Sequence, residues 1–200
     1  SSVRTALKAR DAGVDIIIAE GVESGGKVSP DEVPTISLIP QVVDAVDVPV
    51  VAAGGLAEGR GLLAALALGA VGVQMGTRFL ACTEADMAHD NWKRVLVQAG
   101  DNATAIACRK SSPTRMIKNQ FFDELDALDE PGKKAMHYMP VQAQGMARIP
   151  TDTDGTTGNY VAGTGAGLIH EIRPAAEIVA EIVDTAAARL RDVQEMFHND

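Results

Sequence analysis

The chain has 200 residues, of which 46% are hydrophobic and 22% are charged, and its formal net charge at pH 7 is −9. This length and composition fit one globular domain with a sizeable core and exclude a mainly disordered chain. The acidic balance, 27 Asp and Glu against 18 Lys and Arg, argues against a nucleic-acid partner.

No apolar run approaches the ~20 residues that a membrane span requires, and the first residues do not form a signal peptide. The two cysteines, Cys82 and Cys108, fit neither a CxxC motif nor the spacing of metal ligands. We therefore expect a cytoplasmic protein without a membrane partner and without a bound metal. Whether it forms a homodimer is left open.

The first part of the chain predicts strands alternating with helices. Residues 1–12 have the apolar spacing of a helix that ends at a glycine. Residues 14–19 form an apolar run typical of a strand buried on both faces, and a glycine-rich loop follows at 20–28. Residues 35–46 return to helical spacing, with one internal proline as an irregularity.

The clearest unit follows, and it consists of two strands joined by a helix. Residues 48–53 and 71–75 are short runs of β-branched and small apolar residues that stop at glycine, and residues 57–69 have helical spacing. Parallel α/β sheets carry their ligands at the carboxyl ends of the strands. We therefore expect both glycine turns and the 20–28 loop to meet at that edge.

The two glycine turns predict a phosphate site. Gly54 and Gly55 let the backbone approach a ligand, because no Cβ stands in the way and a positive φ is accessible. Gly76 and Thr77 add two N–H groups and a hydroxyl. N–H groups that converge at a helix N-terminus favour an anion. The alternative is that both are only tight turns between strand and helix.

The second part of the chain predicts mainly helices. Residues 83–99 and 112–128 have helical apolar spacing, and a short extended segment lies between them at 104–108. Residues 129–170 show no clear period and predict an irregular layer over one end of the sheet. A last helix is expected over residues 174–197, with a proline at its start.

Three strand–helix units point to an α/β protein of TIM-barrel or doubly wound type. Three segments then resemble successive motifs of one family: Ala-Glu-Gly-Val-Glu-Ser-Gly-Gly at 19–26, Pro-Val-Val-Ala-Ala-Gly-Gly-Leu at 49–56 and Gln-Met-Gly-Thr-Arg-Phe at 74–79. The family is the FMN-dependent nitronate monooxygenases (2-nitropropane dioxygenase-like), grouped with the flavin-containing enoyl-ACP reductase II. Residues 114–119 and 162–169 resemble later segments of the same family.

The resemblance implies an FMN-binding TIM barrel, of which this chain would carry the last three of eight parallel strands. Residues 1–110 would be the C-terminal part of that barrel. Residues 111–200 would be a helical and irregular addition whose final helix packs on the barrel. On this interpretation the chain is a C-terminal fragment with an open sheet edge.

The resemblance also assigns cofactor contacts. Those expected at the FMN phosphate are Gly54, Gly55, Gly76 and Thr77. Those expected near the flavin ring, at a strand end and in the glycine-rich loop, are Gln74, Gly25, Gly26 and Glu20. At the position of Glu20, relatives often carry glutamine.

The main departure from the family pattern is Lys27, the candidate catalytic residue. The pattern continues Gly-Gly-His, and that histidine is taken to act in proton transfer, to which its near-neutral pKa is suited. A lysine with an unperturbed pKa of ~10.4 is charged at neutral pH. A dry pocket would convert it into a base. A wet pocket would leave a cation that stabilises reduced flavin or attracts an anionic substrate, and we favour this second role.

Three functions remain open, each with a small-molecule ligand. The first is nitronate oxidation by FMN and oxygen. The second is an NAD(P)H-dependent flavin reductase acting on an enoyl thioester or a quinone, towards which Glu-Ser-Gly-Gly at 23–26 leans. The third is a non-catalytic fragment that at most binds phosphate.

Overall fold

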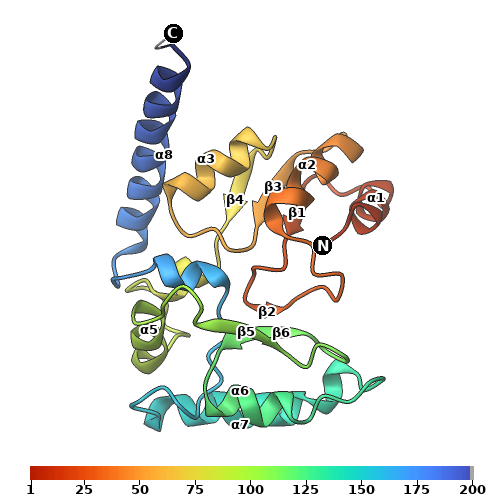
Figure 1. The fold of residues 1–200 in the computed structure, drawn as a ribbon, viewed down its shortest axis with the longest axis vertical. Helices are drawn as coiled ribbons and strands as arrows, with labels where there is room; N and C mark the ends of the chain where they lie inside the picture. Colours follow the sequence, from red (N-terminus) through yellow and green to blue (C-terminus); the bar gives the residue numbers. More distant parts are fainter. Residues whose placement is uncertain (199–200) are drawn as a thin grey trace.

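Two small sheets organise the residues that the computed structural model describes, 1–198 (Figure 1). The first is parallel and has the order β1-β3-β4: β1 (Ile17–Glu20), β3 (Val50–Ala53) and β4 (Gly72–Gln74). The second is antiparallel and has the order β2-β6-β5: β2 (Gly26–Lys27), β6 (Thr114–Ile117) and β5 (Thr104–Ala107).

The parallel sheet confirms the predicted order of three adjacent strands joined by helices. The connecting helices are α2 (Thr35–Ala45), which contains the predicted internal proline, and α3 (Gly59–Ala67). β1 begins later than the predicted residue 14, because the neighbouring strand offers its first acceptor at Pro49, whose carbonyl binds the N–H of Ile17 at 3.0 Å. Within residues 1–198, no strand therefore pairs with residues 14–16.

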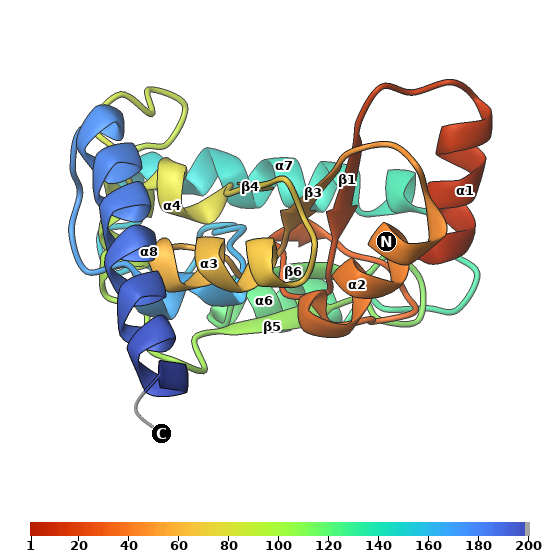
Figure 2. The same cartoon turned by 90° about the horizontal axis from the view of Figure 1, so that it is seen from above.

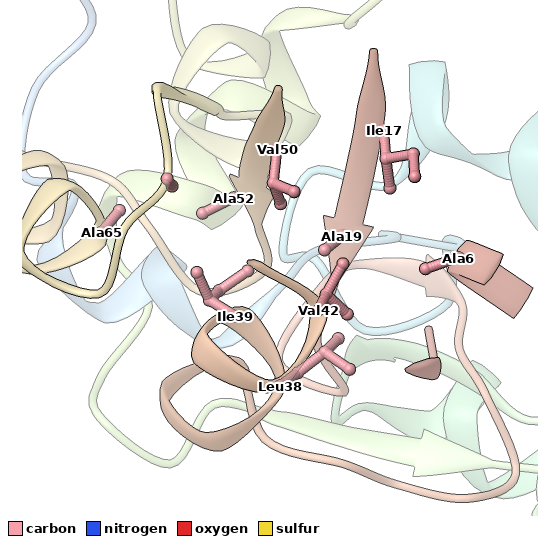
Figure 3. Close-up of a cluster of buried hydrophobic side chains, with 10 residues drawn as sticks. Ala6, Ile17, Ala19, Leu38, Ile39, Val42, Val50, Ala52 and Ala65 are labelled. Carbon is pink, nitrogen blue, oxygen red and sulfur yellow. The ribbon is translucent and has the colours of Figure 1, made fainter. Parts of the chain in front are cut away.

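One face of the parallel sheet is covered within this chain. Helices α1 (Val3–Asp11) and α2 pack on it, and alternate strand residues point towards them, as the two-residue period of a strand requires (Figure 3). The buried cluster there consists of Ala6, Ile17, Ala19, Leu38, Ile39, Val42, Val50, Ala52, Ala65 and Ala70. On the other face Ile18 is 53% exposed, so the prediction of strands buried on both faces is wrong for the described chain.

The predicted helix at 83–99 is half as long in the structure. A short helix, α4 (Thr77–Leu80), follows β4, and α5 covers only Asp90–Val97. The ring nitrogen Nδ1 of His89 accepts the N–H of Asn91 at 3.2 Å and so fixes the start of α5. The turn before α5 is bound to residue 175 instead of extending the helix, because the carboxylate of Glu84 accepts the N–H of Ala175 at 2.9 Å.

The predicted helix at 112–128 is wrong in its first half, which is strand β6. Helix α6 (Gln120–Asp126) is capped by Asn119, whose side chain accepts the N–H of Phe122 at 2.9 Å. The predicted extended segment at 104–108 is confirmed as β5, and its pairing with β6 explains the difference. The loop predicted at 20–28 also contains strand β2, which pairs with β6.

The layer predicted to be irregular at 129–170 contains one regular helix, α7 (Met139–Arg148), and three 3-10 turns, η1 (Ala135–His137), η2 (Ile149–Thr151) and η3 (Thr164–Leu168). Helices α6 and α7 lie beyond the β5–β6 hairpin, away from the parallel sheet (Figure 1).

The predicted last helix is confirmed as α8 (Ala175–His198), which lies beside α3 (Figure 2). The two helices approach closely at Gly59, where a Cβ would lie 2.6 Å from the carbonyl oxygen of Ile182. No helix within residues 1–198 is long and apolar enough to cross a membrane.

The packing of α2 on the sheet gives a test with a matched control in the same helix. Ile39 is fully buried against the sheet, whereas Ile36 is 62% exposed. We expect Ile39→Ala to lower the free energy of unfolding by about 2–5 kcal/mol, because it leaves a cavity. We expect Ile36→Ala to change it by no more than about 0.5 kcal/mol. Urea denaturation measures both, and equal losses would contradict the position of α2.

Candidate ligand-binding site

A pocket of about 470 Å³ lies where β1, β3 and β4 end at their carboxyl edge. Seven of the nine predicted site residues line it: Glu20, Gly25, Gly54, Gly55, Gln74, Gly76 and Thr77. The remaining two, Gly26 and Lys27, lie in strand β2 and do not line it. The edge of the sheet at which the sequence predicted a site is therefore the edge that carries this pocket.

The first glycine turn is required by the fold itself. Gly54 and Gly55 have φ values of 106° and 71°, in the left-handed region that favours glycine. A Cβ on Gly55 would lie 2.8 Å from the Cβ of Glu23 and 3.0 Å from Oγ1 of Thr164. A side chain at position 55 would therefore disturb the turn itself, whether or not a ligand is bound.

The second glycine turn has a different reason. Gly76 has φ −87°, which any residue can adopt, and a Cβ there would meet no atom within 4 Å. It stands directly before Thr77, at the start of α4. The backbone conformation at Gly76 therefore does not require glycine, but the missing side chain leaves space at the pocket wall.

The loop after β1 is anchored by Glu23, a residue that the sequence analysis did not single out for this role. Its carboxylate accepts the N–H of Thr35 at 2.9 Å and lies 2.8 Å from the Thr35 hydroxyl. The residue before Thr35 is Pro34, which has no side-chain cap to offer helix α2. The same hydroxyl lies 3.0 Å from the carbonyl oxygen of Gly54. Glu23 thus caps α2 and holds the loop beside the first glycine turn.

A segment from the far end of the chain closes the pocket. The N–H of Thr164 donates to the carbonyl oxygen of Glu23 at 2.9 Å, and the N–H of Gly163 donates to the hydroxyl oxygen of Thr77 at 2.9 Å. A Cβ on Gly25 would lie 2.6 Å from the nitrogen of Gly163, so the two backbones touch. Glycines close together in residues 163–167 were the available sequence signal for this contact.

The remaining lining is mostly apolar, with one buried hydroxyl. The apolar side chains are Ala53, Leu56, Met75, Phe79, Leu80, Ala85, Met87 and Val161. Ser24 also lines the pocket; it is 8% exposed, and its hydroxyl has no hydrogen-bond partner among the described residues. Within residues 1–198, no cluster of His, Cys, Asp and Glu is arranged to hold a metal ion.

Lys27 is held by the second sheet. Its ammonium donates to the hydroxyls of Ser112 at 2.6 Å and Thr114 at 2.7 Å, and to the carbonyl oxygen of Ser112 at 3.2 Å. Partial burial lowers the pKa of Lys27, while nearby Cys108 acts in the opposite direction. Three oxygen acceptors use all three ammonium protons. In this structure, then, the Lys27 head group binds β6 and its preceding loop instead of the pocket.

Comparison with known proteins agrees with these features. The family described as nitronate monooxygenase matches residues 1–185. A protein from Staphylococcus saprophyticus subsp. saprophyticus, described as a probable nitronate monooxygenase, is 38% identical over 141 residues, which are 65% of this chain and 39% of that protein. The chain spans about two fifths of the length of such curated relatives.

Two solved structures share the fold over nearly the whole chain. FabK from Thermotoga maritima has a TM-score of 0.88 at 34% identity, covering 98% of this chain and 62% of its own. A nitroalkane oxidase from Streptomyces ansochromogenes has a TM-score of 0.79 at 30% identity, covering 94% of this chain and 57% of its own. These matches confirm the resemblance that the three sequence motifs indicated.

The anchoring role of Glu23 can be tested by stability. In Glu23→Gln, the neutral amide loses the charge-assisted hydrogen bonds at the start of α2, and we expect the free energy of unfolding to fall by about 1.5–3 kcal/mol. Glu177→Gln is the control, because Glu177 lies on the exposed face of α8 and pairs with Arg173; its loss should stay within about 1 kcal/mol. Urea denaturation that finds the two variants equally stable would contradict the anchor.

Proposed function

The chain belongs to the nitronate monooxygenase family, and from this premise we propose that it provides the FMN-binding part of a flavin-dependent oxidoreductase. The observation that carries the proposal is the pocket in which both glycine turns and the loop after β1 meet. Its position at the carboxyl edge of a parallel sheet is the usual place for a ligand in α/β proteins.

The donors around the pocket fit a phosphate group. Among the described residues, the backbone N–H groups of Gly55, Gly76 and Thr77 have no hydrogen-bond acceptor. Unpaired N–H groups at tight turns suit an anion, and the open space at Gly76 lets it approach the backbone. We propose that Gly54, Gly55, Gly76 and Thr77 hold the FMN phosphate.

The remaining contacts are proposed for the flavin ring. Gln74 ends β4, while Glu20 and Gly25 belong to the end of β1 and its loop, and all three line the pocket. Gly26 adjoins them in β2. FMN, when bound, would supply the electron transfer. The residues of this chain would bind its phosphate, orient the ring and exclude water with the apolar part of the lining.

We also propose that the parallel sheet forms the last three strands of an eight-stranded TIM barrel. β1 and β4 are both edge strands, and the exposed Ile18 marks a face that further strands and their side chains would cover. The barrel part would span residues 1–110 and the addition 111–200. This boundary would fall in the loop between β5 and β6. The two strands that the loop joins both belong to the second sheet.

For the reaction, family membership supports oxidation of a nitronate by oxygen. The second candidate, reduction of an enoyl thioester or a quinone by NAD(P)H, is favoured by one observation. Lys27 stands where the family pattern has its proton-transferring histidine. Burial lowers the pKa of Lys27, while its three oxygen acceptors act in the opposite direction because they stabilise the protonated ammonium. A lysine that keeps its proton cannot serve as a base, but it can stabilise negative charge on reduced flavin or substrate.

Gly76 offers the test of FMN binding, since its replacement needs no backbone change. We expect Gly76→Val to obstruct the phosphate and weaken FMN binding at least about 100-fold, while the free energy of unfolding changes by less than about 1 kcal/mol. Gly100→Val is the control, because Gly100 is exposed in a loop and a Cβ there also meets no atom within 4 Å. Fluorescence titration of FMN into apoprotein measures affinity. Unchanged affinity in Gly76→Val would place the phosphate elsewhere.

Lys27 offers the test of the reaction. If its positive charge suppresses base catalysis, Lys27→His should raise nitronate turnover by about 100-fold, the lower end of the range of general base effects. Lys110→His, in the exposed loop of the β5–β6 hairpin, is the control and should leave turnover unchanged. Oxygen consumption with a nitronate measures this rate. Efficient nitronate oxidation by the unmodified flavin-loaded protein, with no gain from the histidine, would contradict the proposed role of Lys27.

A further inference from the structure

Arg78 is a buried cation without a carboxylate partner among the described residues. It is only 7% exposed, and its Nη2 donates to two backbone carbonyl oxygens, those of Ala81 at 3.1 Å and Glu171 at 2.8 Å. Burial lowers the pKa of Arg78, and the more distant charges of Glu171 and Glu181 offset this only in part. A buried charge without a close counter-ion costs free energy, so it calls for an explanation.

Part of the Arg78 guanidinium remains open to a ligand. An arginine carries N–H donors on Nε, Nη1 and Nη2, and the two carbonyl contacts use only Nη2. Nε is fully buried without an acceptor. Nη1 also makes no hydrogen bond within residues 1–198, but it is not among the fully buried atoms in this condition. Nη1 is therefore the accessible donor of this side chain.

A second cavity, of about 560 Å³, lies beside this guanidinium, between helices α3 and α8 (Figure 2). Both Arg78 and Glu171, whose carbonyl oxygen holds Nη2, line it. It has no lining residue in common with the pocket at the strand ends. The cavity is therefore a separate site, to which no role has yet been assigned.

The start of helix α3 forms another wall of this cavity. Glu58, Gly59 and Arg60 all line it. Glu58 precedes the helix without capping it through its side chain, and the N–H groups of Gly59 and Arg60 have no acceptor among the described residues. Free N–H groups at the first turn of a helix favour an anion.

The carboxylates in the lining do not neutralise Arg78. Each of them binds a different arginine: Glu58 pairs with Arg60, Asp192 with Arg189, and Glu171 and Glu181 with Arg173. The side chains of these four acids are 34–61% exposed, so solvent and salt screen their charges. The buried charge at the cavity wall is therefore the positive charge of Arg78.

We propose that this second cavity binds a phosphate ion, held by Nη1 of Arg78 and by the first N–H groups of α3. A tetrahedral oxyanion presents oxygens in several directions, so one ion can accept from the guanidinium and from a helix start together. The bound ion would supply the counter-charge that Arg78 lacks. This site is independent of the proposed FMN function, because the two cavities are lined by different residues.

Two neighbouring alanines of α8 provide matched test variants. Ala188 lines the cavity, whereas Ala187 does not, and both are exposed on the same helix. Ala188→Glu adds a negative charge at the cavity wall, and we expect it to weaken phosphate binding at this site by about tenfold or more. Ala187→Glu adds the same charge outside the cavity and should leave phosphate binding unchanged. Arg78→Gln should weaken it as Ala188→Glu does, because it removes the cation.

The experiment is calorimetric titration of inorganic phosphate into the unmodified protein and the variants, at constant ionic strength. Phosphate binding that Ala188→Glu weakens and Ala187→Glu preserves supports the proposal, even if Arg78→Gln does not fold. Absence of phosphate binding by the unmodified protein overturns the proposal. Equal binding by the unmodified protein and both alanine variants also overturns it, because the phosphate then lies elsewhere, as at the two glycine turns.

Discussion

The candidate site depends on the carboxylate of Glu23 at the start of helix α2. The helix begins after Pro34, so its first N–H groups need an acceptor from elsewhere. Glu23 supplies it through Thr35, and an anion at a helix N-terminus is further favoured by the helix dipole. This one contact joins the loop after β1 to the helix that covers the sheet. The backbone carbonyl of Glu23 also accepts the N–H of Thr164. Glu23 therefore connects the loop after β1 both to helix α2 and to the segment that contains Thr164.

Glycine serves two separate purposes around this site. At Gly25 and Gly55 the neighbouring backbone or side-chain atoms leave no space for a Cβ, so glycine allows segments distant in the sequence to touch. At Gly76 nothing lies nearby, and glycine keeps space free at the wall. The distinction matters for interpretation, because substitution at the first kind of position changes the fold and substitution at the second kind tests the ligand.

The second sheet controls the charge near the site. Strand β2 continues directly from the pocket loop and pairs with β6, which brings Lys27 to Ser112 and Thr114. Its acceptors are neutral oxygens, so the positive charge is bound but has no carboxylate partner among the described residues. The β5–β6 hairpin therefore positions a cation that the loop sequence alone would leave free.

The sequence alone determined the parts of the structure that depend on local patterns. Short apolar runs that end at glycine defined the three parallel strands and their order, and the family motifs identified seven residues of the pocket wall. The apolar stripe and the proline at its start defined α8. In these segments the periodicity, the turn residues and the tertiary packing all favour the same structure.

Only the tertiary structure decided the features that depend on pairing between distant segments. Residues 114–117 have helical spacing, yet they form a strand because β5 and β2 offer backbone partners on both sides. Lys27 leaves the pocket wall for the same reason, since its strand pairs with β6. The anchoring contacts of Glu23 depend on residues 35 and 164 lying beside one loop. Spacing within a segment carries no information about such neighbours, because hydrogen bonds between distant segments form only when the chain has folded.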